Sequence, residues 1–77
     1  PEEASVHLDM GDMMWDQARW DWAAHHYGEA LKADPQDAWA LPSSYAAQYR
    51  LTGDERWKQS LQALADAGNE RAGALMW

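Results

Sequence analysis

The side chains best suited to chemistry in this chain are three histidines and three aspartates. His25 and His26 are adjacent, so on a helix they point about 100° apart and lack the i, i+4 spacing with which helical residues chelate one ion. His7 would join one of them only through tertiary packing. Metal binding is therefore the alternative to a simpler interpretation, in which the histidines are solvated residues on helix surfaces.

The aspartates follow a helical spacing in the N-terminal part of the chain. Asp9, Asp12 and Asp16 occur at i, i+3 and i+7, which places them on one side of a helix. Such a row attracts a cation or a basic peptide, although a solvated polar face is the simpler interpretation.

No catalytic motif accompanies these residues. The sequence has no triad-like order of Ser, His and Asp, no Gly-rich phosphate loop and no calcium-binding loop. Nothing in it implies an enclosed pocket or a cofactor signature. We therefore expect a protein that is not an enzyme and that holds no cofactor.

The composition limits the size of the fold and the ways in which its core can be stabilised. The 77 residues suffice for one small domain, which we expect to span 1–77, and no Cys is present to crosslink it. The core must come from packing alone, for which the chain has six Trp and three Tyr. A lack of Cys suits a soluble protein of the cytoplasm or of the periplasm, so the compartment stays open. No run of about 18 apolar residues occurs, so we expect no membrane insertion.

The net charge narrows the class of partner. Thirteen Asp and Glu against six Lys and Arg leave the chain at −7. Nucleic acid is disfavoured as a partner because phosphates bind basic surfaces, and an anionic membrane surface is disfavoured for the same reason. The acidic surface either keeps a Trp-rich domain soluble or selects a neutral or basic protein partner.

Apolar periodicity predicts two helices in the first half of the chain. The first begins at a Ser5 N-cap and ends near residue 16 or 17. Its apolar face consists of Val6, Met10, Met13 and Met14. The second helix begins near Trp20 and has the clearest amphipathic pattern. It ends before Pro35, because a residue that precedes proline is pushed out of the helical region.

The second half predicts two further helices and a short tail. Asp37 is expected to cap a third helix with the apolar face Leu41, Tyr45, Gln48 and Tyr49. Pro42 either kinks this helix or marks where its regular part begins. Residues 52–54 end the third helix and cap a fourth, which stops at residues 68–69. The tail is compatible with a short fifth helix that buries Ala72, Leu75 and Met76. The terminal Trp77 either packs on that helix or is offered to a partner, and no segment has the alternation of a strand.

The two halves also resemble each other. A shift of 35 residues places Gly11 on Ala46 and Met14 on Tyr49. A shift of 37 residues aligns the second and fourth helices, with Trp20 on Trp57, Ala23 on Ser60, Tyr27 on Leu64 and Ala30 on Ala67. A period in this range is typical of helix-turn-helix repeats.

The first half resembles a tetratricopeptide repeat. That family has a small residue in its first helix, here Gly11, and then a series of aromatic and small residues before a terminal proline. The matching residues of the second helix are Trp20, Ala23, Tyr27, Ala30, Leu31 and Pro35. His7 and Ala18 depart from the family, which commonly has Trp and Gly at these positions. The second half matches less closely, because Pro42 and its longer turn do not fit.

The resemblance implies an all-α fold, a short solenoid of stacked antiparallel helical hairpins. The two repeat-like units would span about residues 4–37 and 38–69, with a C-terminal cap at 70–77. In this family the first helix of each pair lines a concave groove that binds peptides. The residues that resemble groove positions are Leu8, Asp12, Trp15, Asp16, Trp39, Tyr49 and Arg50.

The expected groove is aromatic and acidic. The family's best-known groove holds a peptide carboxylate with Lys, Arg and Asn, whereas this chain has only Arg50 there. Trp and Tyr are enriched among binding hot spots. The simpler interpretation is that Trp15 and Trp39 pack against a neighbouring helix.

Two hypotheses about function follow. The first is a protein–protein interaction module that binds a peptide or helix of a partner or docks in a larger assembly. Self-association is compatible with it, because two repeats expose an apolar end on each side. The second is a small ligand- or metal-binding protein that uses the aromatic groove or the histidines.

Overall fold

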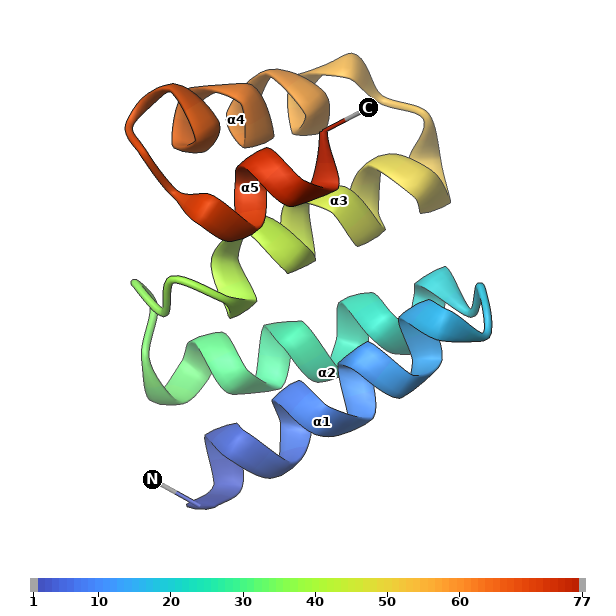
Figure 1. The fold of residues 1–77 in the computed structure, drawn as a ribbon. Coiled ribbons are helices and arrows are strands. Elements are labelled where there is room, and N and C mark those ends of the chain that lie inside the picture. Colours follow the sequence, from blue (N-terminus) through green and yellow to red (C-terminus); the bar gives the residue numbers. More distant parts are fainter. Residues whose placement is uncertain (1, 77) are drawn as a thin grey trace.

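The computed structural model describes the backbone of residues 2–76 and the side chains of residues 4–76, and this part of the chain is helical without strands (Figure 1). The five helices are α1 (Glu2–Asp16), α2 (Trp20–Ala33), α3 (Ala40–Thr52), α4 (Glu55–Asp66) and α5 (Glu70–Leu75). Each helix packs against the next one, and α5 also packs against α3. The expected all-α stack of helical hairpins is confirmed, whereas Trp77 lies outside the described residues. None of the helices described has the length and apolarity needed to cross a membrane.

Helix α1 differs from the prediction in where it begins and in which face it buries. It begins at Glu2, so Ser5 lies inside the helix and does not cap it. No Pro or Gly lies between Glu2 and Ser5 that would stop the helix from extending. The predicted apolar face is wrong except at Met14, since Val6, Met10 and Met13 are 53%, 41% and 56% exposed.

The face that α1 buries is decided by Gly11. This residue is buried against Tyr27 of α2, whose side chain has no exposed surface. A Cβ at position 11 would lie only 2.7 Å from Cε1 of Tyr27. The missing side chain therefore lets the two helices approach, and Leu8, Met14 and Trp15 pack around the contact. Sequence periodicity alone does not distinguish this face from the methionine face on the other side of the helix.

The turn from α1 to α2 places Ala18 in a backbone conformation that favours glycine. Ala18 has a φ of 58°, in the left-handed region that favours glycine. Its N–H donates to the carbonyl of Trp15 at 2.9 Å, and the N–H of Arg19 donates to the carbonyl of Met14 at 2.8 Å. These two hydrogen bonds are the pattern of a Schellman cap. The backbone thus adopts the conformation of the usual glycine, and the Ala18 side chain adds strain of about 1–2 kcal/mol.

Helix α3 lies between α2 on one side and α4 and α5 on the other (Figure 1). Its expected apolar face is partly buried at each position, Leu41, Tyr45, Gln48 and Tyr49, and Tyr45 packs against one of the core clusters. The buried residues of α3 are all small or compact: Ala40, Pro42, Ser43, Ser44, Ala46 and Ala47. A helix with neighbours on several sides needs small residues where those neighbours approach, and its larger side chains lie at the margins of the contacts.

The start of α3 accommodates Pro42 without a kink in the helix interior. Pro42 is the third residue of α3, in the first turn, where a missing N–H is tolerated. Asp37, the predicted cap, accepts from the N–H groups of Trp39 and Ala40 at 2.9 Å, so it caps the turn that leads into α3, whose own N-cap residue is Trp39. Residues 38 and 39 form an irregular turn before the helix, which is the second of the two alternatives for Pro42.

The carbonyl that Pro42 leaves without a helical donor is used by the C-terminal part of the chain. This carbonyl belongs to Ala38, and it accepts from Nδ2 of Asn69 at 3.0 Å. The other polar side-chain atom of Asn69, Oδ1, accepts from the N–H of Ala72 at 2.8 Å and so caps α5. One amide therefore ties the turn before α5 to the start of α3.

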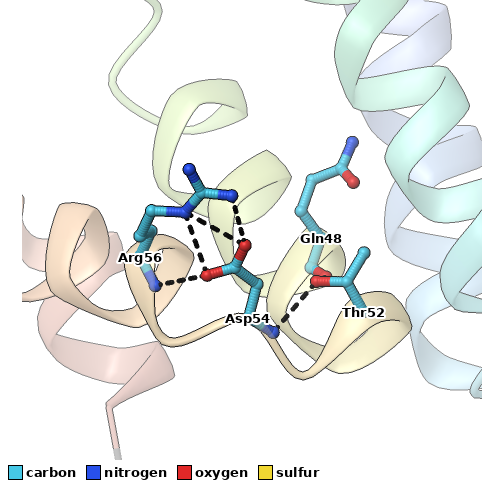
Figure 2. Close-up of polar contacts among 4 residues, drawn as sticks. All are labelled: Gln48, Thr52, Asp54 and Arg56. Carbon is cyan, nitrogen blue, oxygen red and sulfur yellow. Dashed lines mark hydrogen bonds and ion pairs between the residues drawn. The ribbon is translucent and has the colours of Figure 1, made fainter.

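The turn between α3 and α4 follows the prediction for residues 52–54 (Figure 2). The Thr52 hydroxyl donates to the carbonyl of Gln48 at 2.9 Å and accepts from the N–H of Asp54 at 3.1 Å. Asp54 caps α4 by accepting from the N–H of Arg56, and its carboxylate also pairs with the Arg56 guanidinium at 2.7 Å. Gly53 supplies the left-handed residue, with a φ of 72°.

Substitution of Gly11 tests the packing of α1 on α2. We expect Gly11→Ala to lower the free energy of unfolding by about 1–3 kcal/mol, because the new Cβ overlaps a buried ring that cannot move aside. Gly28→Ala is the matched control: it lies inside α2, and a Cβ there meets no atom within 4 Å. This control should raise stability by about 0.5–1 kcal/mol through helix propensity. Urea unfolding measures both, and a stabilising Gly11→Ala would contradict the described packing.

Candidate functional site

The polar group that joins most elements of the fold is the carboxylate of Asp12 on α1. The Tyr27 hydroxyl of α2 donates to its Oδ1 at 2.5 Å. The indole Nε1 of Trp39, the residue before α3, donates to both carboxylate oxygens at 3.0 and 3.1 Å. The Asp12 carboxylate therefore links the two helices of the first hairpin and also links this hairpin to the second.

Arg71 brings α5 to the same place. Its Nη2 lies 3.7 Å from Oδ1 of Asp12, and its Nε donates to the Ser43 hydroxyl of α3 at 3.0 Å. The Arg71 guanidinium carbon lies 4.0 Å from the centre of the Trp39 ring, in cation–π contact. We call Asp12, Tyr27, Trp39, Ser43 and Arg71 the Asp12 network. It contains side chains from α1, α2, α3 and α5 and from the residue before α3.

The protonation of Tyr27 suits its part in this network. Burial raises the pKa of the Tyr27 hydroxyl well above its ordinary value, and the hydrogen bond to the Asp12 carboxylate raises it further. The hydroxyl therefore stays protonated at neutral pH and acts as a donor. A structural hydrogen bond fits this environment better than acid–base chemistry, which needs a pKa near the working pH.

The residues predicted to line the groove divide into several environments. Asp12 and Trp39 are brought together, but their polar atoms bind each other inside the Asp12 network. Leu8 and Trp15 are partly buried against the core, and Trp15 touches both of its clusters. The simpler interpretation of Trp15, as a packing residue, therefore accounts for its place. Sequence reasoning missed Arg71, although it is the only Lys or Arg after Lys58.

The remaining predicted groove residues lie near the α1–α2 turn or on the last turns of α3. The Arg50 guanidinium lies over the rings of Trp15 and Trp20, at 5.7 and 5.3 Å from their centres. Tyr49 is partly buried and has the Lys58 ammonium 5.9 Å from its ring centre. Asp16 is exposed. The groove therefore stays a prediction, and its exposed members are Asp16, Trp39 and Arg50.

The histidines are less solvated than their sequence positions indicate. Nδ1 of His7 on α1 lies 3.1 Å from Nδ1 of His26 on α2, and the two rings stack. His26 is buried, so the expectation of a solvated surface residue is wrong for it, whereas His25 is exposed. Within the described residues, no group of three or more His, Asp and Glu could hold a metal ion.

The outer side of α1 carries an exposed apolar surface. Val6, Met10 and Met13 occur at i, i+4 and i+7 and form one row, which we call the α1 stripe. Asp9 and Asp16 lie along one edge of the α1 stripe, both exposed, and neither forms an ion pair with another described residue. Among the residues that the structure describes, the other large exposed apolar residues are Trp22, Trp39 and Leu51.

Comparison of the chain with protein-family models, with curated proteins and with solved structures gives no match. The function is therefore inferred from the fold and from the chemistry of its surfaces.

The buried histidine predicts a pH-dependent stability. Burial lowers the pKa of His26 below its ordinary value, and His25 and His7 lower it further, against an opposing effect of Glu29. The unfolded chain, with a His pKa of about 6.5, thus binds more protons than the folded chain, so stability is complete above this pH and declines as the pH falls below it. Urea unfolding between pH 7.5 and 5.5 should show this decline.

The control for this pH dependence is His26→Gln, which removes the buried titrating group. Its free energy of unfolding should vary less over the same range than that of the unsubstituted chain, whatever its absolute stability. An equal slope in both proteins would show that His26 does not titrate as described.

Proposed function

We propose that this domain is a protein-interaction module and that its role is binding, not catalysis. The observation that carries the proposal is the α1 stripe, a row of three large apolar side chains that are each 41–56% exposed. Contiguous apolar patches are uncommon on the surface of a monomer, and those that occur often mark interaction sites. Apolar residues at i, i+4 and i+7 also have the spacing with which one helix binds another.

The position of α1 in the stack supports the proposal. It is the first helix and packs mainly on α2, so its opposite side has no neighbour within the described chain (Figure 1). In a stack of helical hairpins, an outer apolar face is where the next helix would pack. A separate protein that binds there would take the place of that helix.

The groove suggested by the tetratricopeptide-like pattern is a second candidate surface for the same function. Its support is the exposed part of Trp39 and the Arg50 guanidinium above two Trp rings. Its weakness is that Asp12, the central acid of the predicted groove, already has its donors inside the fold. We therefore place the partner on the α1 stripe.

Selection from a displayed library of random peptides tests the proposal over many peptide sequences at once. The immobilised domain should enrich peptides that bind in solution, and Met13→Glu should weaken that binding at least tenfold. Arg50→Glu, at the edge of the predicted groove, should leave it unchanged. Failure to enrich any peptide above a domain-free surface would overturn the proposed function, and loss of binding with Arg50→Glu alone would assign it to the groove.

A further inference from the structure

We propose that the α1 stripe binds a basic amphipathic helix. This inference rests on the proposed function and adds the chemical class of the partner. Three features of α1 carry it: the shape of the stripe, the charges beside it and the residue at which the helix ends.

The α1 stripe has the shape of a helix-binding surface. Its three side chains span two turns, or about 10 Å at 1.5 Å per residue. Two of them are Met, whose unbranched and polarisable side chains adjust to the apolar residues of a partner. A partner helix would contact this row with apolar residues at i, i+3 or i+4 and i+7.

The charges of α1 favour a basic partner. The helix contains five acidic residues and no Lys or Arg. Asp9 and Asp16 lie two turns apart on one edge of the α1 stripe, where Lys or Arg residues at i and i+7 of a partner would face them. A second copy of this chain is a poor occupant, because α1 against α1 would place acidic residues opposite acidic residues.

The end of α1 gives a further reason. Asp16 is the last residue of the helix, and the last turn has no basic residue. A negative charge at this position opposes the helix dipole and destabilises the isolated domain. A cationic side chain of a partner would relieve this repulsion, so the residue is unfavourable for the free domain and favourable for the proposed complex.

A designed peptide serves as the probe. It is a labelled helix with Leu at i, i+3, i+4 and i+7 and Lys at the flanking positions, compared with the same peptide carrying Glu in place of Lys. Fluorescence anisotropy at low salt should show the Lys peptide binding at least tenfold more tightly than the Glu peptide. Equal binding of the two peptides would overturn the proposal.

Two substitutions locate the site and two controls match them. Met10→Glu and Asp16→Lys should each weaken binding of the Lys peptide at least tenfold, and Asp16→Lys should also raise the melting temperature of the free domain. Leu51→Glu introduces the same acid at another exposed apolar residue, and Asp66→Lys makes the same charge change at the end of α4. Both controls should bind as the unsubstituted domain does; equal weakening by the controls would contradict the assignment to α1.

The outcomes separate this inference from the proposed function. If library selection yields binders that depend on Met13 but the Lys peptide does not bind, the basic-helix inference is wrong and the interaction module stands. If neither experiment detects binding, both are wrong. Sedimentation of the free domain should show a monomer, and a dimer that Met10→Glu dissociates would assign the stripe to a second copy and overturn the inference.

Discussion

A partly buried carboxylate on the first helix holds the ends of this fold together. Asp12 accepts hydrogen bonds from Tyr27 and Trp39, and Arg71 approaches it from the last helix. An unpaired polar group in the interior costs about 1–3 kcal/mol, or more when it is charged, and the Asp12 side chain, which is 36% exposed, is subject to only part of that cost. One side chain therefore constrains the positions of α2, of the start of α3 and of α5. Most of the sequence lies between Asp12 and Arg71.

Small residues set the other constraint. The core consists largely of alanines and serines, and Gly11 allows α1 to rest on the Tyr27 ring. Close approach of backbones leaves little space inside for large side chains, so several of the largest apolar residues lie at the margins or outside. The exposed α1 stripe follows from the same packing. Because small residues fill the interior, Met10 and Met13 stay available for contact with another molecule.

Much of the fold could be predicted because its signals are local. The ends of α2, the Asp37 cap and the turn at residues 52–54 each follow from residues adjacent in the sequence. The buried faces of α1 and α3 could not be predicted from periodicity, because more than one face of each helix has helical spacing and tertiary contact chooses between them. The pairing of Asp12 with Arg71, and that of His7 with His26, depends on which helices become neighbours, so residue spacing within one helix contains no sign of it.

A double-mutant cycle between Asp12 and Trp39 tests the central claim most directly. Asp12→Ala removes the acceptor, and Trp39→Phe removes the indole donor while it keeps an aromatic ring beneath Arg71. If the carboxylate joins the two hairpins, the free energies of unfolding of the two single variants and the double variant should give a coupling energy of about 1 kcal/mol or more. Additivity within about 0.3–0.5 kcal/mol would mean that the hydrogen bond between Asp12 and Trp39 does not hold the hairpins together and would contradict the account.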